Sequence, residues 1–183
     1  MLTDLGTRKI IVKVVYFGAA MSGKTTSLRY IFKKFGRDLQ SIENQAGRTL
    51  FWDHGTIPIQ KGQWTFEISV WSCTGQNFYA ETRPTVLEGV DGIIFVADSQ
   101  LNLIGDNKAS WSELSLMLGD KWKKIPITII LNKRDSPNAV SMAEFKNFMG
   151  LNNSTAIFET IATEGINVME SFRDLIQRIF NYA

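Results

Sequence analysis

Hydrophobic and polar positions along the chain predict alternating strands and helices. Short runs rich in β-branched or aromatic residues predict strands, because such residues suit a pleated and half-buried surface. The predicted strands are Ile10–Phe17, Thr49–Asp53, Trp64–Trp71, Gly92–Ala97, Ile127–Leu131 and Thr155–Glu159. Apolar residues at helical spacing predict helices over Lys24–Phe35, Trp111–Trp122, Ser141–Met149 and Val168–Ile179.

The predicted strands differ in how their apolar residues are arranged. Gly92–Ala97 and Ile127–Leu131 are apolar almost throughout, which is typical of strands buried on both faces of a parallel sheet. Trp64–Trp71 alternates, and the Lys61-Gly62 turn joins it to Thr49–Asp53 as a hairpin. We therefore expect an α/β fold with a mainly parallel, doubly wound sheet of six strands, one antiparallel edge strand and about five helices. A ligand is expected on the loops after the strands.

Length and charge narrow the classes of protein. The chain has 183 residues, which predicts a single domain over residues 1–183. Its 44% of hydrophobic residues are enough for a sizeable core, and they exclude a disordered chain. Twenty Lys and Arg against eighteen Asp and Glu leave a net charge of only +2. We therefore expect no nucleic-acid partner, because binding to a phosphate backbone relies on a large basic excess.

The cysteine count and the hydropathy indicate a compartment. Cys73 is the single cysteine, so the chain forms no internal disulfide. The first residues, MLTDLGTRK, lack the apolar region of a secretory signal, and no apolar run reaches membrane-spanning length. We expect a cytoplasmic protein with no integral membrane segment.

A phosphate-binding motif follows the first predicted strand. Gly18 to Thr25 reads GAAMSGKT, which fits G-x-x-x-x-G-K-[ST], and the helix predicted from Lys24 begins within it. The glycines let backbone N–H groups turn toward a polyphosphate, the lysine reaches the β and γ oxygens, and the threonine hydroxyl ligates Mg²⁺. The strand and helix on either side disfavour a chance glycine-rich turn. The expected nucleotide contacts are Gly18, Ala20, Met21, Ser22, Gly23, Lys24, Thr25 and Thr26, with Lys24 also catalytic and Thr25 a metal ligand.

A second motif indicates the base. Asn132-Lys133-Arg134-Asp135 directly follows the strand Ile127–Leu131 and fits N-K-x-D. A carboxylate at Asp135 can accept two N–H bonds from guanine, while the Asn132 amide meets the opposite base edge and the Lys133 stem packs beside the rings. Adenine lacks those donors, so an ATP-dependent enzyme would leave Asp135 idle. The motifs together predict GTP or GDP as the bound nucleotide.

The order of these segments resembles a Ras-like small GTPase, and more narrowly the bacterial gliding-motility GTPases of the MglA type. The resemblance covers nearly the whole chain. It is carried by the phosphate-binding loop running into KTTSLRYI, by residues 48–53, 75–79 and 89–92, by FVADSQ, and by NKRDSPNAV from Asn132 to Val140. It implies a Ras-like fold and hydrolysis of GTP with Mg²⁺.

The resemblance also assigns further site residues. Ile161-Ala162-Thr163 stands where such proteins have a third base-binding loop, S-A-K, of which only the alanine is kept. Ala162 and Thr163 are therefore candidate base contacts, and a plain loop remains an equal alternative.

Two further segments match the switch regions of the family. Thr49 matches the threonine that completes Mg²⁺ coordination, Gly75 and Gln76 match the nucleotide-contacting glycine and the water-orienting glutamine, and Arg48 matches an arginine finger supplied in cis. Three alternatives stay open. Thr49 is also a good strand residue, Gln76 a common helix-starting residue, and Arg48 a solvated side chain in a loop.

One position departs from the general Ras-like pattern. The family's D-x-x-G motif corresponds to Ser72-Cys73-Thr74-Gly75, so Ser72 stands in place of the aspartate. Proteins of the MglA type also tend to have a hydroxyl residue at this position. This hydroxyl leaves the Mg²⁺ shell without one carboxylate, a change that bears on the rate of hydrolysis more than on the binding of nucleotide.

Two functions follow from the resemblance. The first is a GTP-binding switch, slow without an activator, whose partner is a roadblock/LC7-domain protein of the MglB kind and whose process is cell polarity or motility. Phe51, Trp52, Phe78 and Tyr79 are candidate anchors for such a partner, or else core residues. The second is a guanine-nucleotide-binding interaction module with negligible hydrolysis, which the serine at position 72 and the altered segment after it favour.

Overall fold

An eight-stranded sheet organises the computed structural model, which describes residues 1–43, 49–73, 83–152 and 154–182. Its strands are β1 (Leu2–Asp4), β2 (Lys9–Phe17), β3 (Gln40–Glu43), β4 (Thr49–Lys61), β5 (Trp64–Cys73), β6 (Gly92–Asp98), β7 (Ile127–Asn132) and β8 (Ile157–Glu159). The helices are α1 (Lys24–Lys34), α2 (Arg83–Leu87), α3 (Ile104–Leu118), α4 (Met142–Met149) and α5 (Val168–Tyr182), with 3₁₀ turns at Leu101–Leu103 and Gly119–Lys121.

The sheet has the order β3-β4-β5-β2-β6-β7-β8. Strands β5, β2, β6, β7 and β8 run parallel, while β4 is antiparallel to β5 and closes the predicted hairpin. The α/β class, the mainly parallel sheet and the five α-helices are confirmed within the described residues.

Two short strands add to the six that the sequence predicts. β3 pairs antiparallel with the outer side of β4, so β4 is not the edge strand. β1 pairs antiparallel with the first residues of β2. It lies along the same edge of β2 as β6, which pairs with later residues of that strand. Both strands were missed because they are short, and all three residues of β1 are exposed and give no buried alternation.

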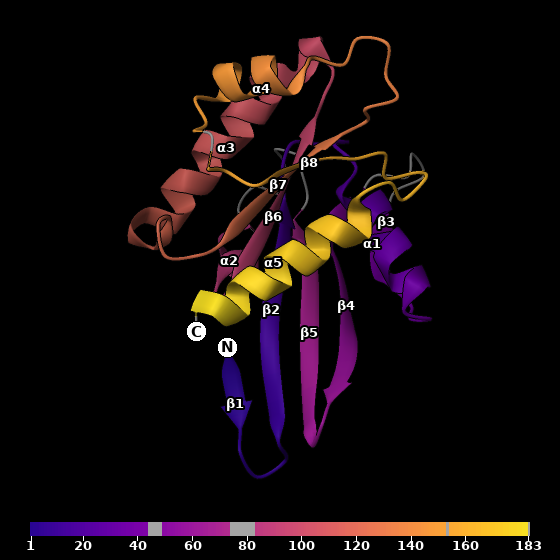
Figure 1. Ribbon diagram of the computed structural model, residues 1–183, viewed down its shortest axis with the longest axis vertical. Coiled ribbons are helices and arrows are strands. Elements are labelled where there is room, and N and C mark those ends of the chain that lie inside the picture. The colour runs from indigo at the N-terminus through magenta and orange to yellow at the C-terminus, as the bar shows by residue number, and fades with distance from the viewer. Residues whose placement is uncertain (44–48, 74–82, 153, 183) are drawn as a thin grey trace.

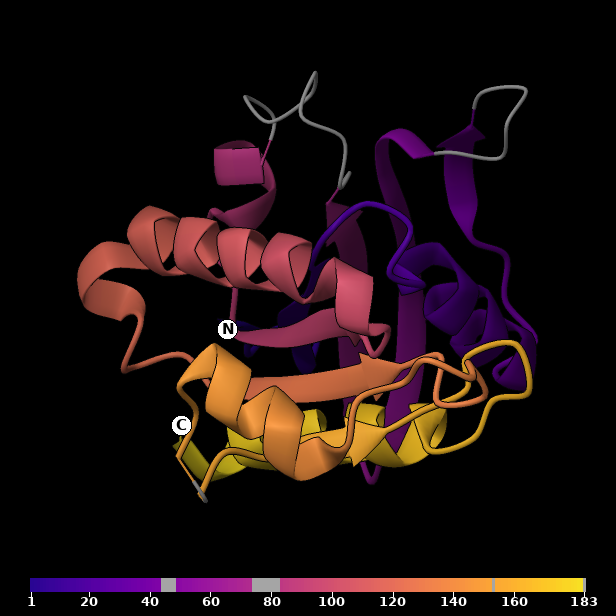
Figure 2. The same ribbon diagram turned by 90° about the horizontal axis from the view of Figure 1, so that it is seen from above.

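Helices cover both faces of the sheet (Figures 1 and 2). α1 and α5 pack on one face, over a core that includes Val12, Val14 and Ile68. α2, α3 and α4 pack on the other face, over a core that includes Val15 and Phe95. Apolar residues from both faces of β2, β6 and β7 are therefore buried, which explains the continuous apolar runs in the sequence.

Some helix boundaries follow the sequence pattern and others do not. Ser141, where a helix is predicted to begin, caps α4, because its Oγ accepts from the Glu144 N–H at 3.2 Å and the Glu144 carboxylate accepts from the Ser141 N–H at 2.8 Å. α3 begins at Ile104, earlier than predicted from the aromatic spacing. The sequence pattern missed these first turns because they are mostly polar. None of the helices in the described part of the chain is both long and apolar enough to cross a lipid bilayer.

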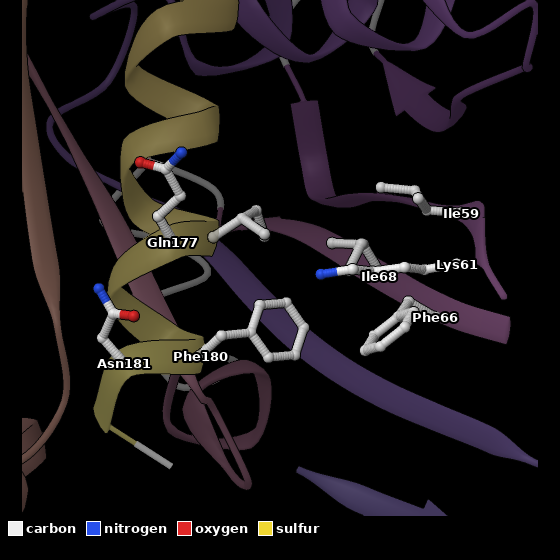
Figure 3. A pocket seen from close by; sticks show the side chains of 8 residues that line it. Ile59, Lys61, Phe66, Ile68, Gln177, Phe180 and Asn181 are labelled. Carbon is white, nitrogen blue, oxygen red and sulfur yellow. The ribbon is translucent and has the colours of Figure 1, made fainter. Parts of the chain in front are cut away.

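A hollow of about 610 Å³ lies between the β4–β5 hairpin and α5 (Figure 3). It is lined by Ile59, Lys61, Phe66, Ile68, Ile176, Gln177, Phe180 and Asn181. The rings of Phe66 and Phe180 meet edge to face with 5.3 Å between their centroids. The hollow belongs to the turn end of the hairpin, whereas the motifs predicted to bind a ligand follow the carboxyl ends of β2 and β7.

Candidate functional site

The loop between β2 and α1 is held tightly against the ends of two neighbouring strands. Gly18 has φ of +147°, and a Cβ there would lie 2.1 Å from the Val96 carbonyl oxygen of β6. Gly23 has φ of +106°, and a Cβ there would lie 2.1 Å from the Asn132 Nδ2 atom. Only glycine fits these two positions, so the motif's glycines fix the path of the loop. Ala20 and Met21, between them, are exposed.

Two side chains in this loop carry groups that can bind a ligand. Lys24 has a positive charge, and Ser22 has a hydroxyl with no hydrogen bond to the described residues. The Lys24 ammonium donates to the carbonyl oxygens of Gly18 and Ala19 at 2.9 and 2.6 Å. Burial lowers the pKa of Lys24 to about 8. The Ser22 hydroxyl is fully buried and has no hydrogen-bond partner among the described residues. Buried donors of this kind suit an anionic ligand with several oxygen atoms.

Thr25, at the start of α1, meets a carboxylate from β4. Its Oγ1 donates to the Asp53 Oδ2 atom at 2.6 Å, and Asp53 is fully buried. Asp53 is paired across the strands with Ser72 of β5. A buried carboxylate on the strand next to Ser72 therefore lies beside Thr25. Hydroxyl and carboxylate oxygens are ligands that Mg²⁺ accepts, directly or through water, so this donor set fits the ion.

Asp53 is not among the site residues that the motifs predict. The available signal was its place at the end of the predicted strand Thr49–Asp53, in a hairpin with the strand that leads to Ser72. Residues 48–53 match the family as a segment, but no role attaches to Asp53 within it, and only the folded structure brings Asp53 to Thr25.

Asn132 joins the loop after β2 to the segment after β8. Its Nδ2 donates to the Ser22 carbonyl oxygen at 2.8 Å, and its Oδ1 accepts from the Ala162 N–H at 3.0 Å and the Thr160 hydroxyl at 3.1 Å. The N-K-x-D motif predicts this amide at the edge of a bound base. In the structure the amide faces these three protein groups and braces two loops of the site.

The remaining residues of the second motif lie beside this brace. Lys133 has a left-handed backbone, with φ of +61°, and its ammonium pairs with Asp98 at 2.6 Å. Arg134 pairs with Glu159 at 2.8 Å, which holds the motif against β8. Asp135 is exposed.

The predicted third base-binding loop is adjacent to the second motif. Ala162 is buried, and its N–H is used by Asn132, whereas Thr163 is exposed. The backbone N–H of Arg134 donates to the Thr160 carbonyl oxygen at 3.2 Å. The structure therefore brings residues 160–163 to the N-K-x-D segment and to the loop after β2.

Several predicted site residues cannot be placed in the same way. Arg48, Gly75 and Gln76 lie outside the described residues, as do Phe78 and Tyr79. Thr49 is the first residue of β4, and its backbone pairs with Glu43 of β3.

The chain is described again from Arg83 onward, and this residue is anchored. Arg83 begins α2, is 5% exposed and pairs with the Glu113 carboxylate of α3. Its guanidinium also lies 6.0 Å from the centre of the Phe17 ring, just before the first motif.

Comparison with known proteins decides the family. A model of the ADP-ribosylation factor (Arf) family matches residues 1–179. The chain is a small GTPase of the Arf and Ras-like family. Such small GTPases generally bind GTP or GDP with Mg²⁺ and hydrolyse GTP, so the resemblance drawn from the motifs is confirmed.

Curated relatives place this small GTPase more narrowly. It is 34% identical over 180 residues to the mutual gliding-motility protein MglA of Myxococcus xanthus, covering 93% of this chain and 91% of the relative. It is 27% identical over 175 residues to the Ras-related protein Rab7 of Pisum sativum, covering 92% and 82%. The Ras-related protein RABG3d of Arabidopsis thaliana is 25% identical over 180 residues, with 94% and 84% covered. The small GTPase is MglA-like.

Proposed function

We propose that this small GTPase is a molecular switch whose nucleotide lies across the carboxyl ends of β2, β6 and β7. The observation that supports this most is the brace at Asn132, which joins the loop between Gly18 and Lys24 to the segment at Ala162. One side of the brace suits phosphates and the other suits a base. A nucleotide that occupies both sides orders the loops around it, and a partner responds to that order.

On the phosphate side, each residue has a proposed role. Gly18, Ala20, Met21, Ser22 and Gly23 present backbone N–H groups, and Lys24 turns from the loop carbonyls to the β and γ oxygens. Thr26 continues these contacts at the start of α1. Thr25 and Thr49 would hold Mg²⁺, with Asp53 beside Thr25 as the acceptor for a metal-bound water. Bound Mg²⁺ would neutralise charge on the β and γ phosphate oxygens.

On the base side, Asp135 accepts the two N–H groups that guanine has and adenine lacks. The Lys133 stem covers one face of the base, and backbone groups at Ala162 and Thr163 border its edge. The exposure of Asp135 and Thr163 supports this role, because both side chains are accessible to a ligand.

For hydrolysis we assign Gln76 to the attacking water and Arg48 to the charge on the transferring phosphoryl group, with Gly75 contacting the γ-phosphate. These assignments rest on sequence position and on the likeness to the gliding-motility protein MglA. The same likeness supports a roadblock/LC7-domain partner that accelerates hydrolysis and a role in cell polarity or motility.

Single-turnover hydrolysis of GTP with Mg²⁺, with and without a candidate roadblock-domain protein, tests the switch. We expect slow hydrolysis that the partner accelerates. Arg48→Ala and Gln76→Leu should each lower the rate by on the order of 10²-fold or more. Tight GTP binding with no turnover under any condition would instead support an interaction module without hydrolysis.

Competition between GDP and ADP tests the base assignment separately. Asp135→Asn should weaken GDP and leave ADP unchanged, because the amide replaces one acceptor by a donor. Asp120→Asn, an exposed aspartate in the 3₁₀ turn Gly119–Lys121, is the matched control and should change neither affinity. An unchanged preference in Asp135→Asn would remove this residue from the base site.

A further inference from the structure

The side chain of Lys133 is held by a buried carboxylate that belongs to none of the nucleotide-binding motifs. Asp98 ends β6 and is 2% exposed, and its Oδ2 lies 2.6 Å from the Lys133 Nζ atom. Such a buried charge requires a partner, and Lys133 supplies the opposite charge. The pair joins the loop after β6 to the loop after β7.

Asp98 is itself fixed by neighbouring groups. The Gln100 backbone N–H donates to its Oδ1 at 3.1 Å. The side chain of Asn107, fully buried in α3, accepts from the Asp98 N–H at 3.0 Å and donates to the Asp98 carbonyl oxygen at 2.7 Å. The carboxylate therefore meets Lys133 from a fixed position.

The backbone of Lys133 is held by the same turn. The Ser99 N–H donates to the Asn132 carbonyl oxygen at 2.9 Å, and the Ser99 hydroxyl donates to the Lys133 carbonyl oxygen at 2.8 Å. Both ends of the Lys133 side chain are thus attached to residues 98 and 99. Its four-carbon stem has little freedom left, because the backbone and the ammonium are both fixed.

We propose that Asp98 is a positioning residue for the base site, which holds the Lys133 stem in place to cover one face of the bound base. The proposal rests on the proposed function, in which guanine occupies the N-K-x-D segment. A lysine side chain otherwise loses considerable rotational freedom when it packs on a ligand. The ion pair removes that freedom before the nucleotide binds, so Asp98 raises affinity without contacting the ligand.

A double-mutant cycle with GDP tests the proposal. Asp98→Asn keeps the shape and removes the anchoring charge, and Lys133→Met keeps the stem and removes the ammonium. Each should weaken GDP by about tenfold, and the double variant should also weaken it by about tenfold, because both changes remove the same anchor. Multiplication of the two effects to about a hundredfold would overturn the proposal.

Tripolyphosphate, which has no base, separates positioning from a general loss of structure. The constant for inhibition of GDP binding by tripolyphosphate should change less than twofold in both single variants, because the loop between Gly18 and Lys24 is untouched. Equal losses for GDP and tripolyphosphate would overturn the proposal. Asp174→Asn is the matched control. It removes a carboxylate of α5 that accepts from Thr128 of β7 and pairs with Arg178 of α5, and it should leave GDP affinity unchanged.

The wild-type protein distinguishes this proposal from the one on which it rests. If the wild type fails to prefer GDP over ADP, the proposed guanine site fails. If it prefers GDP and Asp98→Asn binds GDP as tightly, only the role of Asp98 fails.

Discussion

At the scale of single residues, the metal side of the site is set by which strand carries the carboxylate. Asp53 on β4 reaches Thr25, while its cross-strand neighbour Ser72 holds the position where the family's D-x-x-G motif has aspartate. Both residues are buried, so a second carboxylate there would place two like charges side by side away from water. Which of the two strands carries the charge can therefore be exchanged, but the charge cannot be doubled without cost.

Ser72→Asp should therefore destabilise the protein although it restores the family's motif. Two carboxylates would face each other across β4 and β5, which should lower the free energy of unfolding by roughly 1–3 kcal/mol. The swap Asp53→Ser with Ser72→Asp should recover most of that loss. Urea unfolding of the nucleotide-free protein measures the free energy, and Mg²⁺-dependent GDP release measures the metal side. A single Ser72→Asp variant as stable as the wild type would contradict this account.

Cys73 provides a test that depends on pH. Burial raises the pKa of its thiol from 9.0 to about 12. The thiolate fraction at pH 8 is then about a thousandfold lower than in an unfolded chain, because a raised pKa keeps the proton on sulfur. We expect iodoacetamide to modify Cys73 more slowly in the native protein than in denaturant, by on the order of 10²-fold or more, because the thiol is both protonated and buried. Equal rates before and after unfolding would show that the thiol is accessible.

At the scale of elements, the strongly periodic segments could be predicted and the weakly patterned ones could not. β2, β6 and β7 are apolar runs, and the helix after the first motif has a clear apolar face, so these follow from the sequence. The three exposed residues of β1 carry no such signal. Asp53 and Asp98 could not be predicted as site residues for a similar reason. A single acidic residue at the end of a strand has no motif of its own. Its partner follows only from the strand register and the loop contacts.

The contact between α2 and α3 supports a prediction at this scale. Arg83 is buried and pairs with Glu113, so it fixes the chain directly after the segment that carries Gln76. A double-mutant cycle of Arg83→Met and Glu113→Ala should show a coupling of about 1–3 kcal/mol in urea unfolding. The Asp174–Arg178 pair within α5, in which both side chains are more exposed than that of Arg83, is the comparison and should couple by less than about 1 kcal/mol. Equal coupling in the two pairs would mean that burial adds nothing to the first.

At the scale of the whole molecule, the proposed site draws on β2, β4, β6, β7 and α1, so the proposed nucleotide would contact residues from most of the sheet. Such a ligand binds the folded chain and not the unfolded one. Its binding energy therefore adds to the stability of the entire domain rather than to one loop.

Guanine nucleotide should accordingly raise the melting temperature of the whole protein. GDP with Mg²⁺ at about a thousand times its dissociation constant adds about 4 kcal/mol. For a chain of 183 residues this is a rise of roughly 8–16 °C. Thermal unfolding in GDP, in ADP and in GDP with EDTA measures the difference. A rise as large in ADP as in GDP would contradict the guanine assignment.

The Asn132 brace has a consequence for how a nucleotide leaves. The amide links the Ser22 carbonyl to the Ala162 N–H, so the loops at the two ends of the ligand are mechanically connected. Coupling of this kind is reciprocal, so a displacement of either loop affects the position of the other. If the nucleotide lies as proposed, we expect displacement of residues 160–163 to loosen the loop between Gly18 and Lys24 as well, and so to speed release of the nucleotide without any contact to that loop.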